Sequence, residues 1–275
     1  MPAANRVRAW RPQTAGIREV FWAEFTDHAY PMHTHDSWTV LTIETGAVRY
    51  ALDRREHGAL TTLVTVLPPH VAHDGQAAQP SGFRKRVLYL EPATLGERLI
   101  GSAVDRPEID DAALQRRIGA LHRSLAAARD GRADGWETDS RLALVTGRLR
   151  DHLTGDPERR GPVRTRAGDR LADGLRALLD ADPVAPPDLV TAGRLLGADP
   201  RHLVRTFSAR FGLPPHRYLT GVRVDRARRL LLAGVPAADA ATGAGFYDQS
   251  HLARHLRTMI DTTPGRYAGG IGRSR

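Results

Sequence analysis

The sequence contains no cysteine, which excludes disulfide bonds, zinc sites with thiolate ligands and catalysis by a thiol. It also has no run of about 18 apolar residues, so we expect no transmembrane helix and no membrane partner. The opening stretch, MPAANRVRAW, lacks the apolar segment of a signal peptide. We therefore expect the protein to be cytoplasmic.

Catalytic motifs are also scarce. The sequence has no P-loop and no GxGxxG motif. His28, Asp74 and Ser81 are scattered among predicted loops and do not suggest a triad of nucleophile, base and orienting residue. We therefore expect a protein that is not an enzyme and that carries no cofactor.

Lysine is nearly absent, so the positive charge of the chain rests on arginine. Lys85 is the only lysine, and the formal net charge is +9 over 275 residues, a length that suits two domains. From residue 155 onward there are 20 Arg and 12 acidic residues, whereas residues 1–154 hold 20 Lys+Arg and 19 acidic residues. The excess therefore predicts a polyanionic partner for the C-terminal part.

Residues 17–92 have the pattern of an all-β domain. Short apolar stretches alternate with turn signals, and many short strands at close spacing favour a barrel or sandwich. The predicted strands are Trp38–Ile43, Ala47–Leu52, Leu60–Leu67 and Arg86–Leu90. The turn signals lie at Thr45-Gly46, Asp53–Gly58, Pro68-Pro69 and Asp74–Gly82.

Residues 94–154 change to helical periodicity and predict two amphipathic helices with a break near Asp130–Gly135. Their apolar positions are Leu114, Ile118, Leu121, Leu125, Leu142, Val145, Leu149 and Leu153. These helices could pack against the barrel or form a dimer seam, and the sequence favours neither role. Residues 155–168, GDPERRGPVRTRAG, have no apolar periodicity and predict a linker.

The remaining residues contain an internal repeat with an offset of 49 positions. A run of matches in one register is not expected by chance. The matched pairs are Ala192 with Ala241, His202-Leu203 with His251-Leu252, Arg205 with Arg254, Phe207 with Leu256, Phe211 with Ile260, Pro215 with Pro264, and Arg217-Tyr218 with Arg266-Tyr267.

Each copy of the repeat predicts a helix-turn-helix unit. In the first copy, a short helix over Asp188–Leu196 ends near Gly197, and Asp199 caps a second helix that starts at Pro200. In the second copy, a helix over Pro236–Ala244 is followed by a turn and a restart at Asp248. The second helix of each copy has an apolar inner face and a polar outer face, which is the helix-turn-helix plan. The inner positions are Leu203, Phe207, Phe211, Leu252, Leu256 and Ile260.

A continuous helix over His216–Leu232 joins the copies and could hold them at a fixed separation. Two recognition helices held in this way could enter successive segments of the major groove, about 34 Å apart. The plainer interpretation is a helical bundle with solvated arginines. That interpretation must also explain the duplicated turn, the duplicated outer-face arginine and the local charge.

The C-terminal motifs resemble the paired helix-turn-helix domain of the AraC/XylS family of bacterial regulators. The resemblance covers about 100 residues, and Gly245-Phe246, Asp248-Gln249-Ser250, Pro264 and Tyr267 match the family signature of the second unit. It implies that the outer faces read bases of double-stranded DNA in the major groove. The residues implied to read them are Arg201, Val204, Arg205, Gln249, Ser250, His251 and Arg254.

The second unit departs from the family pattern at several core positions. Ala240-Ala241 replaces a bulkier Ile-Ala pair, Leu256 replaces a common Phe, and Asp261 replaces a common Gly. We therefore expect the first unit to contribute more of the affinity for DNA.

The N-terminal motifs resemble the cupin-like effector domain that precedes such DNA-binding domains, over about 75 residues. The motifs are His33-Thr34-His35-Asp36, Thr45-Gly46-Ala47, Leu67-Pro68-Pro69-His70 and His73-Asp74-Gly75. The resemblance implies a small-molecule effector. From the alternation of side chains, we expect the pocket to be lined by His35, Trp38, Tyr50, His73 and Tyr89.

Two other interpretations of the histidines stay open. His33, His35 and His73 lie where cupins often hold a metal, because residues two apart on a strand share one face. The usual cupin Glu is missing, since positions 39 and 40 are Thr and Val, so a small-molecule pocket is favoured over a metal site. A purely structural role is the third interpretation.

Together these patterns predict a multidomain regulator. An all-β cupin-like effector domain over residues 1–93 is followed by a helical support or dimerisation segment over 94–154, a linker, and an all-α DNA-binding domain over 169–270. We expect a homodimer that contacts DNA, a small-molecule effector and RNA polymerase. The alternative is a metal-dependent cupin enzyme with an accessory helical domain.

Overall fold

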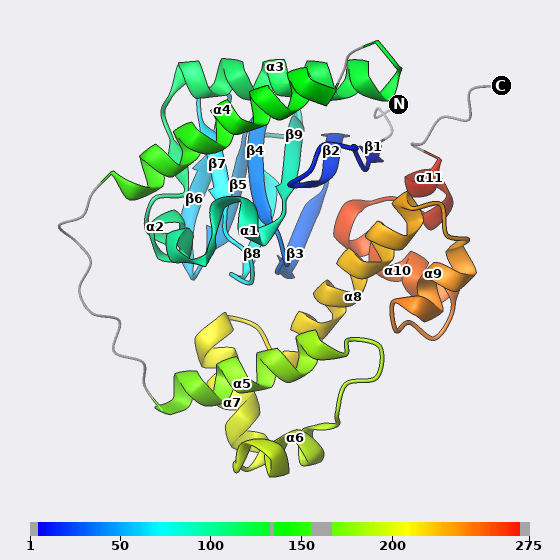
Figure 1. Ribbon diagram of the computed structural model, residues 1–275. Coiled ribbons are helices and arrows are strands. Elements are labelled where there is room, and N and C mark those ends of the chain that lie inside the picture. Colours follow the sequence, from blue (N-terminus) through cyan, green and yellow to red (C-terminus); the bar gives the residue numbers. More distant parts are fainter. Residues whose placement is uncertain (1–4, 133–134, 156–166, 270–275) are drawn as a thin grey trace.

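The computed structural model describes residues 5–132, 135–155 and 167–269. Figure 1 shows a β domain with α3 (Ala112–Arg129) and α4 (Gly135–Thr154) along one side. The helices of the C-terminal part lie on other sides of the β domain, in two groups joined by α8 (Pro215–Leu232). None of the described helices is long and apolar enough to cross a membrane.

Among the described residues, ten strands form two antiparallel sheets that share an apolar core. The strands are β1 (Arg6–Trp10), β2 (Ile17–Phe25), β3 (Ala29–His33), β4 (Trp38–Thr45), β5 (Val48–Leu52), β6 (Arg55–Ala59), β7 (Val64–Leu67), β8 (His73–Ala77), β9 (Phe83–Leu90) and β10 (Glu108–Ile109). One sheet has the order β1-β2-β9-β4-β7-β10 and the other the order β3-β8-β5-β6. Phe21 and Val87 of the first sheet and Val48 and Leu52 of the second belong to one buried cluster, so the two sheets face each other.

Two predicted turns are wrong in part, because they contain strands. Within Asp53–Gly58 the turn is confined to Asp53 and Arg54, which have positive φ, and β6 follows at once. Strand β6 is polar because it is an edge strand with one exposed face. Strand β8, with the sequence HDGQA, overlaps the predicted turn Asp74–Gly82, and its residues His73 and Asp74 line a cavity that is described below.

The predicted helical segment packs against the outer face of the six-stranded sheet. All eight of its predicted apolar positions are buried, together with Val20, Val40 and Leu88 of the sheet. The segment also contains more than two helices: α1 (Pro92–Leu95), a short 3-10 helix (Glu97–Leu99), α2 (Ile100–Asp105) and β10 precede α3. Because β10 pairs with β7, this segment completes the β domain.

Seven helices lie within residues 167–269, the described C-terminal part, and they follow the predicted repeat. They are α5 (Ala167–Ala181), α6 (Leu189–Leu196), α7 (Pro200–Phe211), α8, α9 (Ala237–Gly243), α10 (Gln249–Ile260) and α11 (Pro264–Ala268). The predicted linker lies almost wholly at residues 156–166, which are outside the described residues.

The local signals of the repeat act as predicted. Asp199 caps α7 by accepting hydrogen bonds from the backbone of Arg201 and His202. Helix α10 starts after Asp248, where the restart is predicted, and the Asp248 side chain accepts from His251 N–H. Gly197 ends α6 in the left-handed conformation, with φ of 64°. All six predicted inner positions of α7 and α10 are buried.

Helix α8 lies against the β domain as well as between the two units. At Gly221, a Cβ atom would lie 3.3 Å from the backbone oxygen of Thr34, so the absence of a side chain permits close approach. Farther along the helix, Arg229 forms an ion pair with Asp36, at 2.9 Å. The β domain and the C-terminal helices therefore meet along α8.

We predict that the layer between the sheet and α3–α4 carries a large share of the stability of the β domain. Leu121→Ala should lower the free energy of unfolding by about 2–5 kcal/mol, because the fully buried leucine would leave a cavity. Leu144→Ala on α4 is the matched control: its leucine is 56% exposed, and its effect should stay within about 0.5 kcal/mol. Urea denaturation followed by circular dichroism measures both, and equal losses would contradict this packing.

Candidate ligand site and nucleic-acid interface

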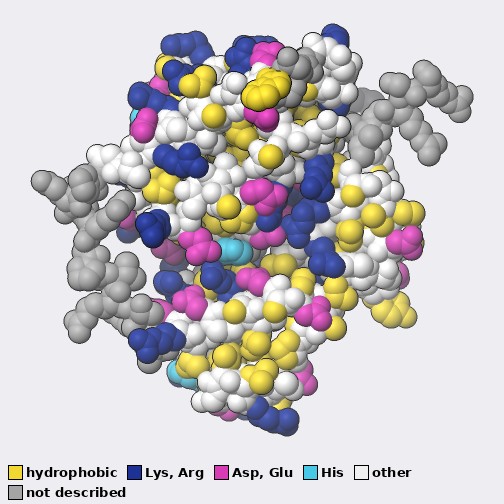
Figure 2. Space-filling model, viewed as in Figure 1, with side chains coloured by type: hydrophobic (Ala, Val, Ile, Leu, Met, Phe, Trp, Pro, Cys, Tyr) yellow, Lys and Arg dark blue, Asp and Glu magenta, His cyan; other side chains and the backbone are white. Residues whose placement is uncertain are grey.

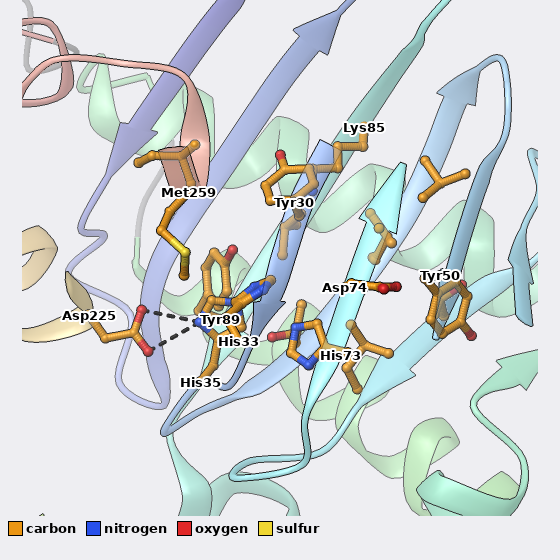
Figure 3. A pocket seen from close by; sticks show the side chains of 18 of the residues that line it. Tyr30, His33, His35, Tyr50, His73, Asp74, Lys85, Tyr89, Asp225 and Met259 are labelled. Carbon is orange, nitrogen blue, oxygen red and sulfur yellow. Dashed lines mark hydrogen bonds and ion pairs between the residues drawn. The ribbon is translucent and has the colours of Figure 1, made fainter. Parts of the chain in front are cut away.

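A buried cavity of about 50 Å³ lies between the two sheets, and the C-terminal helices close one of its walls. Figure 3 shows Met259 of α10 and Asp225 of α8 approaching the cavity from the side opposite Tyr50. The C-terminal residues that line it are Val224, Asp225, Arg228, Met259 and Ile260. The cavity is therefore built by both parts of the chain.

Four of the five predicted pocket residues line this cavity: His35, Tyr50, His73 and Tyr89. The placement of Trp38 is wrong. Trp38 is fully buried on the other face of β4, in the layer under α3 and α4, and its neighbour Thr39 faces the cavity instead. Both faces of β4 are buried, so its sequence does not distinguish the residues that face the cavity from those on the other face.

The three histidines of the predicted metal alternative converge in the cavity. The register of β3 and β8 places His33 directly opposite His73, and His35 follows β3 by two residues. One ring nitrogen from each of the three histidines lies within 4.8 Å of the others. The two Nε2 atoms of His33 and His35 are 3.2 Å apart.

The second nitrogen of each of these rings has its own partner. Nδ1 of His33 lies 2.7 Å from the backbone oxygen of Pro31, and Nδ1 of His73 lies 3.0 Å from that of Val71. Nδ1 of His35 lies 3.1 Å from both carboxylate oxygens of Asp225.

Burial sets the protonation of this cluster. Burial and the neighbouring histidines lower the pKa of His33 well below its ordinary value and that of His73 to about 3, so both rings are neutral near pH 7. For Asp225, burial opposes ionisation, but His35 and Arg228 outweigh it and lower the carboxyl pKa. Asp225 is therefore ionised beside His35.

The only lysine of the sequence is buried in the same cavity. Nζ of Lys85 lies 4.0 Å from the ring centroid of Tyr30, a cation–π geometry. Burial, with a smaller contribution from Arg228, lowers the pKa of Lys85 to about 7. In the described part of the chain no carboxylate forms an ion pair with Lys85, and the hydroxyls of Tyr30 and Thr39 have no hydrogen-bond partner. The cavity therefore offers a cation and two hydroxyls to a ligand.

A buried network around Arg228 joins α8 to the β domain. The guanidinium lies 2.8 Å from Glu19 of β2 and 3.1 Å from Asp225, and it also donates to the hydroxyl of Tyr267 at 2.8 Å. The Tyr267 hydroxyl in turn donates to Glu19. A second contact of this kind runs from His70 through Tyr218 of α8 to Asp180 of α5.

Sequence reasoning missed Glu19, Asp225 and Arg228. Asp225 and Arg228 are three positions apart in a helix that is otherwise rich in arginine. An acidic residue within that basic helix was the one available signal, and nothing in the sequence indicates its partners, which lie about 200 residues away.

The predicted DNA-reading residues lie on the outer faces of α7 and α10. Arg201, Arg205, Gln249, Ser250 and Arg254 are exposed. Val204 and His251 are half-buried, and the His251 ring packs at 5.3 Å against that of Phe246. Figure 2 shows basic and acidic side chains gathered across the middle of the molecule, where the β domain meets the C-terminal helices. In that region Asp36 forms ion pairs with Arg18 and Arg229, and the buried Arg228 pairs with acids on both sides.

Two family models match this chain. Residues 18–145 match the AraC-like ligand binding domain, and residues 193–269 match a helix-turn-helix domain. The chain is also 41% identical over 58 residues to YbfI of Bacillus subtilis (strain 168), an uncharacterized HTH-type transcriptional regulator. That match spans 21% of this chain and 21% of YbfI, about a fifth of the length of each.

Solved structures of ToxT from Vibrio cholerae share the fold along nearly the whole chain. ToxT of strain O395 has a TM-score of 0.58 and 10% identity, and 98% of each chain is covered. The unsaturated fatty acid bound wild-type ToxT of strain SCE256 has a TM-score of 0.55 and 11% identity, with 98% of this chain and 96% of that chain covered. With its two matched family models and its paired helix-turn-helix units, the chain belongs to the AraC family.

Proposed function

We propose that this protein is a sequence-specific DNA-binding transcription regulator, and that a small molecule in the N-terminal cavity modulates its DNA binding or activation. The observation that carries the proposal is the shared cavity. Its wall includes Asp225 and Arg228 of α8 and Met259 of α10, so residues of the DNA-binding part contact the space that an effector would fill.

The shared wall supplies a mechanism for the modulation. A ligand shifts a conformational equilibrium only if its affinity for the two states differs. An effector in this cavity would contact α8 and the inner face of α10 directly, so its affinity depends on whether these helices stay docked. Effector binding would thereby change the population in which the two recognition helices are held against the β domain.

The helical part supports base reading by α7 and α10. Their outer faces expose Arg205 and Arg254 at equivalent positions of the repeat, and arginine pairs with two acceptors of guanine in the major groove. Helix α8 separates the two units and is about 27 Å long at 1.5 Å per residue. That length is of the order of the spacing between successive major-groove segments, about 34 Å.

The cavity favours a small effector that carries an acidic group. Lys85 and the hydroxyls of Tyr30 and Thr39 would bind a carboxylate, while Leu41, Leu67 and similar residues supply apolar walls. Related folds accept such ligands, since one ToxT structure holds an unsaturated fatty acid and another a butenoic acid derivative. A ligand of fatty-acid size would require this cavity to widen.

The homodimer stays a proposal, and so does a contact with RNA polymerase. The outer face of α4 exposes Trp136 at 83% and Leu144 at 56%, an apolar surface that suits a second copy. Sedimentation of wild type and Trp136→Ala would test the dimer, since a shift of the variant toward monomer is expected.

The rival metal-dependent enzyme predicts turnover and no sequence-specific DNA binding.

A genome-wide binding map of the full chain tests the proposed function directly, and we expect discrete sites with a shared motif. A map without reproducible sites would contradict the proposal. The motif would also supply the operator for binding measurements.

We predict that Arg205→Ala and Arg254→Ala each weaken binding to this operator by about 1–3 kcal/mol and relax its sequence preference. Arg205→Ala should cost more, because the core of the second unit contains smaller residues. Fluorescence anisotropy at several salt concentrations measures both. Arg116→Ala is the matched control, since Arg116 is exposed on α3, away from both recognition helices. Wild-type affinity in both test variants would show that these faces do not read DNA, and a larger loss at Arg254 would reverse the ranking.

We predict that the buried lysine makes stability rise with pH. The pKa of Lys85 is about 7 in the folded chain against 10.5 ordinarily, so the unfolded chain binds more protons between these values. Its contribution to stability is full above about pH 10.5 and is lost as pH falls through about 7. Lys85→Met should therefore stabilise the chain at pH 7 and flatten the increase between pH 7 and 10. Urea denaturation across this range tests it, and parallel curves for wild type and variant would contradict a desolvated lysine.

A further inference from the structure

We propose that His33, His35 and His73 bind one divalent transition-metal ion through their Nε2 atoms, and that Asp225 of α8 orients His35 for this ion. The three ligands come from the β domain, whereas the carboxylate comes from the helix that joins the two DNA-binding units. The ion would thus link the ligand domain to the DNA-binding part.

The hydrogen bonds of the three rings fix their tautomers. A backbone carbonyl only accepts, so Nδ1 of His33 and Nδ1 of His73 must carry the proton that faces Pro31 and Val71. Their Nε2 atoms then present lone pairs. A neutral His35 that donates from Nδ1 to Asp225 presents a third lone pair.

The three ring nitrogens lie within 4.8 Å of one another, and such close lone pairs are unfavourable without a positive charge between them. The Nε2 atoms of His33 and His35 are 3.2 Å apart, and the ring centroids of His33 and His73 are 4.4 Å apart. Two nitrogen ligands at about 2.0–2.1 Å from a tetrahedral ion lie roughly 3.3–3.4 Å apart. The spacing of His33 and His35 therefore matches two ligands of one ion.

The ligand chemistry selects the class of metal. Three imidazoles suit zinc, copper, iron, nickel or cobalt and do not suit magnesium or calcium. Three protein ligands also leave at least one coordination position open, which is the arrangement of sites that exchange a ligand. That position would face the cavity, where an acidic effector of the kind proposed above could reach it.

Asp225 supplies the outer contact that metal-binding histidines usually have. Both of its carboxylate oxygens lie 3.1 Å from Nδ1 of His35, and Figure 3 shows this carboxylate reaching the ring from the side of α8. Such a carboxylate fixes the ring and raises its basicity, and its loss lowers metal affinity about 10–100-fold. Metal occupancy and the docking of α8 should therefore favour each other.

Titration of the metal-free, untagged full chain with Co²⁺ tests the site by visible absorption. We expect one ion per chain and the intense absorption bands of a four- or five-coordinate site, with displacement by Zn²⁺. His73→Gln should abolish these bands. His216→Gln is the matched control, because His216 is exposed on α8, and it should titrate like wild type.

Asp225→Asn tests the contribution of the Asp225 carboxylate to metal affinity while the three histidine ligands stay in place. The amide keeps the size of the side chain but removes its charge, so Co²⁺ affinity should fall about 10–100-fold while the one-ion stoichiometry remains. Wild-type affinity in this variant would overturn the link to α8. The measurement on Asp225→Asn also tests the proposal if His73→Gln fails to fold.

Other outcomes would overturn the site itself. No stoichiometric binding of Co²⁺ by the wild-type chain would show that the three histidines do not form a metal site. Equal loss in His216→Gln would indicate surface binding. The regulatory consequence of the ion rests on the proposed function, so binding of the operator by wild type and His73→Gln is measured in parallel. If the wild-type chain binds the operator but no metal, only the metal site is rejected. If it binds the metal but not the operator, only the proposed function is rejected.

Discussion

The guanidinium of Arg228 is the group on which the arrangement of this molecule depends. It is buried between Glu19 of the β domain and Asp225 of its own helix, and it also contacts Tyr267 of α11. Removal of one partner from such a buried pair leaves an uncompensated charge and costs about 3–5 kcal/mol. The positions of α8 and α11 relative to the β domain are therefore fixed more strictly than apolar packing alone would fix them.

The same network determines the chemistry of the cavity. Asp225 pairs with Arg228 on one side and orients His35 on the other, so the polarity of the histidine cluster depends on a residue of the DNA-binding part. Lys85 lies in the same cavity without a carboxylate partner among the described residues. At one end of the cavity, Asp225 balances the charge of Arg228. At the other end, Lys85 has no such carboxylate beside it among the described residues. A ligand that altered either end would change the forces that hold α8 in place.

The sequence was sufficient wherever structure depends on neighbours along the chain. The cap at Asp199, the helix restart at Asp248 and the apolar faces of α7 and α10 agree with the prediction, because short-range hydrogen bonds and helical periodicity determine them. The motifs around His33 and His73 indicated the cavity. The sequence was insufficient where register or distant pairing decides. Trp38 was assigned to the wrong face of a doubly buried strand, β6 and β8 were too polar to recognise, and the partners of Arg228 are distant in sequence.

Double electron–electron resonance tests the central claim, that the buried network holds the DNA-binding part against the ligand domain. The chain lacks cysteine, so Arg117→Cys on α3 and Arg210→Cys on α7 would give two unique spin-label positions, both exposed. The account predicts one narrow distance distribution in the otherwise wild-type chain. It predicts a broad distribution when Glu19→Gln is added, because Arg228 loses its anchor in β2. An equally narrow distribution in the Glu19→Gln chain would contradict the account.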